Sequence, residues 1–457
     1  MLSPLSHPLD RRRFLGLASL GVAATALTAC AGPSTSGAAP GAAASSSSSV
    51  DWASVKPAAT IQFWSSNPGS SQQVTQQIVD AYNASQSATK VTLVTAGASY
   101  EDIAAKFQTA QASGQLPDLM VLSDVWWFRY FLQGSITPLN DLLEAAEVQT
   151  SDYRKTFLDD YSYAGSTWAV PWARSTPLFY YNKDHWKAAG LPDRAPATWQ
   201  ELAEWAPKLQ AAGLGTQHAY QLPAVAGYAG WTLQNNLWGW GTGWSQKDSF
   251  TITCDSSAAQ QALQFLQDAV YKDRWAGVAS TSAITDLTAK AVSATTSSTG
   301  DLRTALKAGT IDLGVGFLPG GPAATEPVCP TGGAGLAIPS GIDPGRQLAA
   351  MQFIKFLTSP ENTVTFSDAT GYIPVRTSAD TTQLLTTTPQ LKTAIDQLSL
   401  TRPQDWARVF LPGADQEMGK TAAAVFTGQA DVASSLSQLK ATLEGIYTRD
   451  VEPKLKK

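Results

Sequence analysis

Arg408 is the side chain whose setting points most directly to binding chemistry. It lies among Trp406, Val409 and Phe410, and such apolar neighbours favour burial. A buried guanidinium needs a negative partner, and its planar fork of donors matches the oxygen pair of a carboxylate or phosphoryl group. A surface ion pair with a nearby carboxylate is the alternative. The sequence therefore predicts that Arg408 holds an anion.

Cys30 is the second residue whose surroundings predict chemistry. It closes the run LTAC at 27–30, which follows RRRFL at 11–15 and an apolar stretch over 17–27. The paired arginines resemble the signal of the twin-arginine export route, and the residues before Cys30 resemble a lipoprotein cleavage box. The apolar stretch is shorter than the roughly 20 residues that a membrane-spanning helix needs. We therefore expect residues 1–29 to be an export signal and a lipid on Cys30 to anchor the protein at the outer face of the cytoplasmic membrane.

Histidine and cysteine, which most often supply catalysis or metal binding, are scarce, with three of each in 457 residues. His7 falls in the export signal, and His185 and His218 are isolated. No HExxH, CxxC or GxSxG motif occurs, so we expect no metal, no cofactor and no enzyme activity. An exported hydrolase is the alternative from another class. Cys254 and Cys329 either pair in an oxidising compartment or stay free, and their sequence positions do not decide this.

Composition predicts an anchored, two-lobed body. Residues 30–55 begin with the lipidated cysteine and continue with small and polar residues, so we expect a flexible tether. The roughly 400 residues that follow exceed what one hydrophobic core usually organises, which favours two lobes. A formal net charge of −5 without a basic run argues against nucleic acid as a partner. Fifteen tryptophans suit a site for a polyol or a sugar as well as a core.

Strand and helix patterns alternate in the first part of the body. The predicted strands span 61–64, 91–95 and 119–122, and the predicted helices between them span 72–83 and 101–112. Strands separated by helices indicate parallel βαβ units, which bind ligands beyond the carboxyl ends of their strands. Tyr100 and Asp124 follow the second and third strands, where such a site is expected.

Later elements follow from capping and periodicity. Thr198 with Glu201 three residues on predicts a helix start. Periodicity predicts helices over 258–270 and 347–357, and the residues at 312–319 predict a strand. The run GGAG at 332–335 lacks the Gly-Lys-Ser/Thr ending of a phosphate-binding loop, and we interpret it as a loop close to the ligand.

Together with the signal and tether, several motifs resemble the extracellular solute-binding proteins of ABC sugar importers. They lie at 176–183, 353–358 and 371–376. Three more motifs, at 126–128, 329–339 and 404–413, resemble the actinobacterial glycerol-3-phosphate and glycerophosphodiester binders within that superfamily. The resemblance covers nearly the whole mature chain.

The resemblance implies an α/β fold of the periplasmic-binding-protein type, with two hinged lobes that close on one ligand. Lobe one would hold 57–174 and 312–358, and lobe two 175–311 and 359–457. The chain would cross between the lobes three times. The implied partners are the membrane permease subunits of the importer, and we expect a monomer.

The resemblance also implies a set of ligand contacts. They fall on Tyr100, Asp124, Ser175, Trp231, Ser298, Gly333, Tyr372 and Arg408, with Tyr228 one helical turn before Trp231. A phosphodiester carries one negative charge and several acceptor oxygens. Arg408 would supply the donor fork, the serines and Tyr372 hydroxyls, and Gly333 a backbone N–H that no side chain obstructs.

Other contacts would serve the rest of the ligand, and each has a structural alternative. Asp124 and Tyr100 would accept hydrogen bonds from glycerol hydroxyls, although Asp124 is also placed to cap a helix beginning at 125–127. Trp231 would face the carbon skeleton or a quaternary ammonium group, or it belongs to the core. Ser175 and Ser298 are equally ordinary turn residues.

The favoured function is therefore a lipid-anchored receptor for glycerophosphocholine, another glycerophosphodiester or glycerol 3-phosphate. A receptor for a disaccharide or an oligosaccharide is the alternative within the binding class, because tryptophan suits sugar stacking. The single cation at Arg408 matches one negative charge better than two, which favours the diester.

Overall fold

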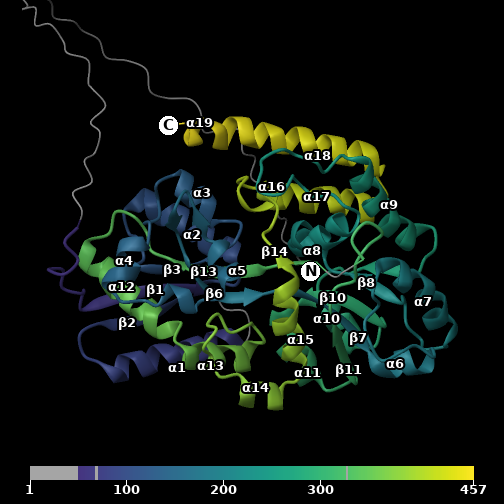
Figure 1. Ribbon diagram of the computed structural model, residues 1–457, viewed down its shortest axis with the longest axis horizontal. Coiled ribbons are helices and arrows are strands. Elements are labelled where there is room, and N and C mark those ends of the chain that lie inside the picture. The colour runs from purple at the N-terminus through teal and green to yellow at the C-terminus, as the bar shows by residue number, and fades with distance from the viewer. Residues whose placement is uncertain (1–49, 67–69, 326–327, 457) are drawn as a thin grey trace, which may run out of the picture. The chain divides into compact units, whose positions relative to one another are not determined.

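Two five-stranded sheets form the centres of two lobes (Figure 1). The structure, a computed structural model, describes residues 50–66, 70–325 and 328–456. The export signal and Cys30 lie outside these residues. None of the described helices is long and apolar enough to cross a bilayer.

The first sheet has the strand order β2-β1-β3-β13-β6. Its strands are β1 Thr60–Ser66, β2 Lys90–Gly97, β3 Leu119–Ser123, β6 Val170–Ser175 and β13 Gly332–Ala337. The first three are parallel, and β13 runs antiparallel to both β3 and β6. Helices α1 Ser70–Ser85 and α2 Tyr100–Ser113 connect the parallel strands. The predicted βαβ pattern is confirmed.

The run at 332–335 is a strand, so its prediction as a loop is wrong. Glycines provide no side-chain pattern that marks a strand, but here their small size is required by neighbours. A Cβ on Gly332 would come within 2.5 Å of the Trp231 ring, and one on Gly335 within 2.9 Å of the Tyr161 ring. The strand is held by its ladders to β3 and β6 rather than by local propensity.

The second sheet has the order β11-β7-β10-β8-β9. Its strands are β7 Pro177–Asn182, β8 Tyr220–Leu222, β9 Ala276–Val278, β10 Ala294–Ser298 and β11 Leu313–Gly316. The remaining strands form two small two-stranded sheets. In one, β4 Ser162–Tyr163 pairs with β5 Ser166–Thr167, and in the other, β12 Cys329–Pro330 pairs with β14 Thr401–Arg402.

Helices pack around both sheets, as Figure 1 shows. Up to residue 308 they are α3 Trp127–Leu132, α4 Asn140–Ala145, α5 Lys155–Asp159, α6 Lys183–Ala188, α7 Trp199–Ala211, α8 Val225–Gly239, α9 Ser257–Tyr271, α10 Ala283–Thr288 and α11 Leu302–Ala308. The later ones are α12 Pro344–Leu357, α13 Pro360–Thr370, α14 Thr382–Thr387, α15 Gln390–Gln397, α16 Trp406–Val409, α17 Ala414–Phe426, α18 Val432–Ile446 and α19 Glu452–Leu455.

The helix start predicted at Thr198 is present, and the helices predicted over 258–270 and 347–357 lie within α9 and α12. The Thr198 hydroxyl accepts a hydrogen bond from the Glu201 backbone N–H at the start of α7. The Glu201 carboxylate bonds the N–H of Ala197 instead of that of Thr198, so only half of the capping arrangement forms. On the first sheet, the rings of Phe63 and Phe353 lie 5.7 Å apart and join α12 to β1.

The chain passes directly from the first sheet to the second through Thr176, which separates β6 from β7. It returns between β11 and β13. The predicted lobe boundary at 312 put β11 in lobe one, but β11 pairs with β7 in the second sheet. The other predicted boundary, at 359, put α13 in lobe two, whereas α13 packs against α1. A strand or helix pattern in the sequence does not specify its packing partner, which explains both differences.

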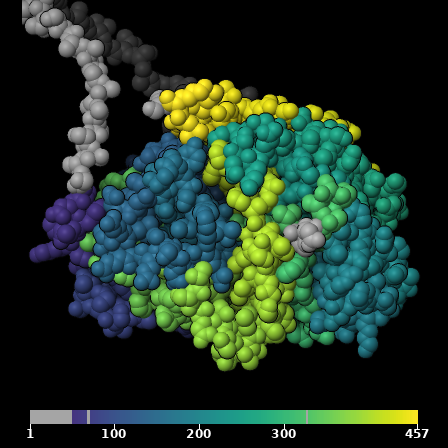
Figure 2. Space-filling model, viewed as in Figure 1, coloured from purple at the N-terminus to yellow at the C-terminus, as the bar shows by residue number. Residues whose placement is uncertain are grey.

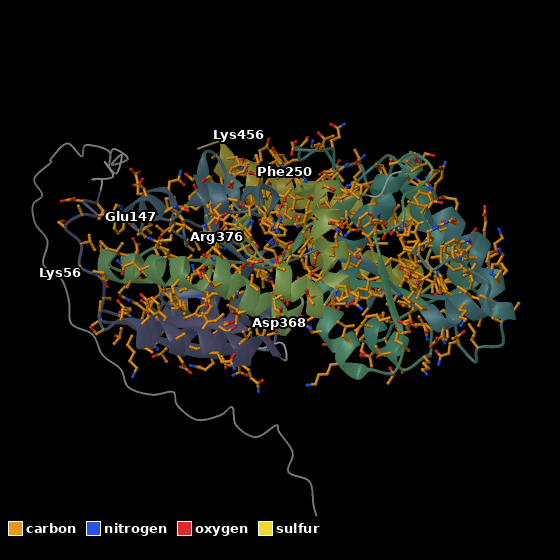
Figure 3. All side chains as sticks on the ribbon, turned by 60° about the horizontal axis from the view of Figure 1, so that its bottom comes forward. Lys56, Glu147, Phe250, Asp368, Arg376 and Lys456 are labelled. Atoms are coloured by element: carbon orange, nitrogen blue, oxygen red, sulfur yellow. The ribbon has the colours of Figure 1, made fainter. Side chains whose placement is uncertain are left out.

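The segment after α13 carries the chain back along the seam between the lobes. Figure 2 shows its yellow-green atoms between the blue residues of the first lobe and the teal residues of the second. Ile373 donates a backbone hydrogen bond to Arg174. Arg376, labelled in Figure 3, is buried and donates to the carbonyls of Thr358 and Gln149. These bonds fix the start of the segment to the first lobe.

A buried ion pair joins two of the passages between the lobes. Arg174, in β6 just before the crossing, is fully buried and donates to the Asp160 carboxylate and to the Tyr161 hydroxyl. Asp160 also accepts from the Thr331 hydroxyl, on the returning passage. The charge pair and its hydrogen bonds therefore hold the two passages together.

Replacing Arg174 with methionine should destabilise the protein by about 3 kcal/mol or more, because Asp160 would be left buried without its cation. The free energy of unfolding in urea measures this. Arg194→Met is the matched control, since Arg194 pairs with Glu201 with half of its side chain exposed and should cost no more than about 1 kcal/mol. Equal losses in the two variants would contradict the structural role of the buried pair.

Candidate functional site

A cleft of about 590 Å³ lies between the two lobes. This volume is within the range of about 300–1,000 Å³ that small-molecule sites occupy. All nine residues predicted for the ligand site line it: Tyr100, Asp124, Ser175, Tyr228, Trp231, Ser298, Gly333, Tyr372 and Arg408. They come from the ends of strands in both sheets, from α2, α8 and α16, and from the segment after α13. The fold thus brings together side chains that lie more than 300 positions apart.

Two tyrosine hydroxyls meet at one wall of the cleft. Tyr100 is the first residue of α2, whose start is held by a capping box between Ser99 and Asp102. Its hydroxyl lies 3.4 Å from that of Tyr372. Burial raises the pKa of Tyr100 well above its ordinary value and also raises that of Tyr372. Both groups therefore stay protonated and can donate hydrogen bonds at neutral pH.

Asp124 faces the cleft and does not cap a helix. Helix α3 begins at Trp127, and its first turn has no side-chain cap. The Asp124 carboxylate instead accepts from the Gln404 amide at 2.6 Å and lies 3.4 Å from an Nη of Arg408. Of the two roles that the sequence left open for Asp124, the structure therefore does not show the capping role, and the side chain lines the cleft.

Arg408 is buried in the cleft wall, as the sequence predicts. It is 6% exposed, and its Nε donates to Asp415 at 2.7 Å. Its Nη1 also donates to the side-chain oxygen of Gln404. Burial acts to lower the pKa of Arg408, but the charges of Asp415 and Asp124 outweigh it and raise that pKa. The guanidinium is therefore a permanent cation, with partners from both lobes.

Aromatic residues of α8 form an aromatic wall of the cleft. The rings of Tyr228 and Trp231 lie 6.3 Å apart at an interplanar angle of 41°. The indole N–H of Trp231 donates to the Thr331 carbonyl at 2.8 Å. Its ring is almost completely buried and still lines the cleft. Trp231 thus serves both as packing and as cleft wall.

Small residues provide the remaining polar surface. Ser175 ends β6 and Ser298 ends β10, so both lie at strand ends beside the cleft. The Ser298 hydroxyl accepts from the Gly300 N–H, which leaves its own hydrogen free to donate. Gly333 has a φ of +106°, a backbone conformation that favours glycine.

Comparison of the sequence and the fold with known proteins identifies the class of protein. Residues 77–393 match the family described as bacterial extracellular solute-binding protein. This chain belongs to that family. The predicted α/β fold with two lobes is confirmed by its structural neighbours.

One relative and two solved structures show how far the similarity extends. The sn-glycerol-3-phosphate-binding periplasmic protein UgpB of Pectobacterium atrosepticum is 27% identical over 347 residues, which are 72% of this chain and 76% of that protein. UgpB from Mycobacterium tuberculosis in complex with glycerophosphocholine has a TM-score of 0.81 at 37% identity, covering 86% of this chain and 100% of that chain. Maltose-bound T. maritima MalE3 has a TM-score of 0.73 at 22% identity, with coverage of 85% and 100%, and shows the shared fold alone.

In this solute-binding protein the cleft also contains residues that sequence reasoning missed. Asp415 and Gln416 line it from the first turn of α17, and Glu101 lines it from α2. Asp415 bonds the predicted Arg408 from seven residues away. A helix start after Pro412 and Gly413 is the signal that would have revealed this acidic first turn.

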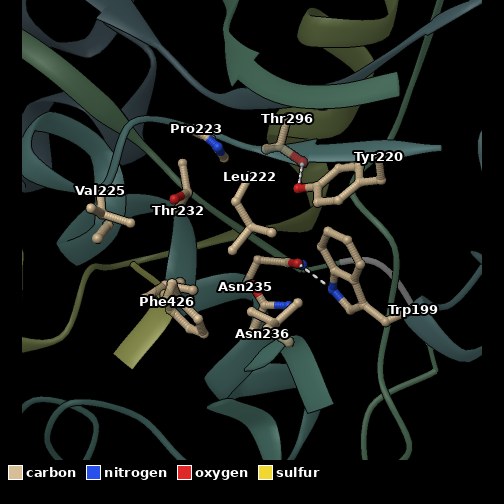
Figure 4. Close-up of a pocket in the computed structure, with 13 residues that line it drawn as sticks. Trp199, Tyr220, Leu222, Pro223, Val225, Thr232, Asn235, Asn236, Thr296 and Phe426 are labelled. Carbon is tan, nitrogen blue, oxygen red and sulfur yellow. Dashed lines mark hydrogen bonds between the residues drawn. The ribbon is translucent and has the colours of Figure 1, made fainter. Parts of the chain in front are cut away.

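A smaller cavity of about 20 Å³ lies inside the second lobe, apart from the predicted residues (Figure 4). The Trp199 indole donates to Asn235 at its edge, and Tyr220 donates to Thr296. The amide nitrogen of Asn236 is buried there without a hydrogen-bond partner. The cavity has room for about one water molecule and is too small for a solute.

Cys254 and Cys329 are both buried and both free thiols. Burial raises the pKa of Cys254 to about 12. The two cysteines are therefore packing residues in this structure.

In the part of the chain that the structure describes, no three His, Cys, Asp or Glu residues gather where they could hold a metal ion.

Replacing Gly333 with alanine should destabilise the protein by roughly 2–4 kcal/mol, because the added Cβ would meet the Ala173 carbonyl oxygen at 2.0 Å in a strained backbone conformation. Thermal unfolding monitored by circular dichroism measures the loss. Gly114→Ala is the control, since Gly114 has a φ of +70° with nothing within 4 Å. Its loss should stay near 1 kcal/mol, and a Gly333→Ala loss no larger than that would contradict the steric argument.

Proposed function

We propose that this protein is the lipid-anchored receptor of an ABC importer and that it captures a glycerophosphodiester, with glycerol 3-phosphate as the weaker ligand. The observation that carries this proposal is the convergence of all nine predicted contact residues in one interlobe cleft. The relatives named for glycerol 3-phosphate and glycerophosphocholine support the same ligand class.

The groups in the cleft suit a glycerol phosphodiester. The Tyr100 and Tyr372 hydroxyls and Ser298 would donate to phosphoryl oxygens, and Arg408 would add a positive charge. Asp124 would accept hydrogen bonds from glycerol hydroxyls. Because these groups come from both lobes, one ligand would bridge them.

The proposed mechanism is conformational. A ligand that contacts both lobes has extra affinity for the closed state and shifts the protein toward it. The closed form would then dock on the permease subunits in the membrane. No bond is made or broken in this cycle, so the protein would act as a receptor and not as an enzyme.

Isothermal titration calorimetry should show one-to-one binding of glycerophosphocholine, weaker binding of glycerol 3-phosphate and none of trehalose. Arg408→Met should weaken glycerophosphocholine binding by roughly tenfold to a hundredfold, because it removes a charge-assisted donor. Lys420→Met is the control, since Lys420 is exposed on α17 outside the cleft. Preferred binding of trehalose would instead favour the sugar receptor that the aromatic wall of Tyr228 and Trp231 also suits.

We propose further that a lipid on Cys30 holds the body at the outer face of the cytoplasmic membrane. The residues before Cys30 support this proposal through their resemblance to a lipoprotein box. Residues 31–49 would then act as the tether between the lipid and the body.

Cys30→Ser should abolish incorporation of radiolabelled fatty acid and shift the protein from the membrane fraction to the soluble fraction, because the thiol is the proposed attachment atom. Cys254→Ser is the control, since that thiol is buried in the body. Unchanged labelling of the Cys30 variant would rule out this anchor.

A further inference from the structure

The cleft carries more negative than positive groups. Glu101, Asp124 and Asp415 line it, and Arg408 is the one basic side chain among the described lining residues. Carboxylates are ionised at neutral pH under ordinary conditions. The lining residues therefore leave an excess of negative charge where a phosphoryl group is proposed to bind.

The positive charge of Arg408 is already offset. Its Nε donates to Asp415 at 2.7 Å, and its Nη1 lies 3.4 Å from Asp124. Another buried arginine, Arg174, is paired with Asp160 beside the crossing between the lobes. An incoming anion thus meets hydrogen-bond donors but little uncompensated positive charge.

Asp415 is the carboxylate whose charge can be removed with the least disturbance of buried contacts. Asp124 is buried and accepts two hydrogen bonds across the lobes. Asp415 is partly exposed at the start of α17 and bonds Arg408 from the cleft mouth, and the exposed Glu101 lines the same mouth from the other lobe. These two carboxylates therefore line the cleft where solvent reaches it.

The aromatic wall complements the carboxylates. Tyr228 and Trp231 line the same cleft, and an aromatic face attracts a cationic group. Negative charge and aromatic faces together disfavour a ligand of unbalanced negative charge and favour one that carries its own cation.

We propose that Asp415 is a specificity-determining residue that makes the cleft select ligands by net charge. With Glu101, it favours phosphodiesters bearing a cationic head group over phosphodiesters and phosphomonoesters with unbalanced negative charge. This inference rests on the proposed function and names the ligand subclass for the same cleft. At an effective dielectric constant near 20, a unit charge changes affinity by roughly tenfold per ligand charge at a distance of about 12 Å, and by more when it lies closer.

Calorimetry with three ligands at pH 8 tests this inference. Glycerophosphocholine has no net charge, glycerophosphoglycerol has one negative charge, and glycerol 3-phosphate has about two. The wild-type affinity should fall in that order. Asp415→Asn should raise the affinity for glycerol 3-phosphate by roughly tenfold or more, raise that for glycerophosphoglycerol by less, and change that for glycerophosphocholine by less than about threefold.

Two further variants complete the test. Glu417→Gln removes the same charge from α17, where Glu417 pairs with Lys420 outside the cleft lining, and should leave all three affinities unchanged. If Asp415→Asn fails to fold, Glu101→Gln at the exposed cleft mouth should give the same charge-ordered gains at smaller size.

The outcomes separate this inference from the proposed function. Equal changes for all three ligands, or a loss for all of them, would show that Asp415 only positions Arg408 and would overturn the inference. Wild-type protein that binds none of the three ligands would overturn the proposed function itself.

Discussion

The contact between Arg408 and its two carboxylates is the interaction on which the cleft depends. A guanidinium that is 6% exposed needs negative partners, and here Asp124 comes from the first lobe while Asp415 comes from the second. Gln404 bridges the first pair, because its amide donates to Asp124 and its side-chain oxygen accepts from Arg408. This arrangement therefore satisfies a buried cation without any solute, and a bound solute must compete with or add to bonds that already exist.

The fold supplies these partners through a general property of α/β sheets. Side chains that follow parallel strands gather at one sheet edge, and Tyr100 and Asp124 lie there after β2 and β3. The second lobe contributes helix starts and the end of β10 instead. One lobe thus presents hydroxyl and carboxylate groups, and the other presents the cation, the Asp415 carboxylate, the Ser298 hydroxyl and the aromatic wall.

Local patterns predicted the parallel strands, their helices and the burial of Arg408, because alternation and apolar neighbours act over short distances. The family resemblance added positions such as Ser298 and Tyr372, which no local signal distinguishes. Neither the local patterns nor the resemblance predicted which elements pack together. The strand β11 joins the second sheet, and Asp415 reaches Arg408 only because the chain turns between α16 and α17. Strand pairing and interhelix contacts depend on the assembled fold and not on neighbouring residues.

The hydrogen bond from Trp231 to Thr331 joins the aromatic wall of the cleft to the passage that returns between the lobes. Thr331 also holds Asp160, which pairs with Arg174 beside the crossing strand. Because the Trp231 N–H is bonded to Thr331 between β12 and β13, any rotation of the lobes would change the surroundings of this indole. Trp231 is consequently a built-in optical reporter, whose contribution to the fluorescence of the fifteen tryptophans would be isolated by comparison with Trp231→Phe.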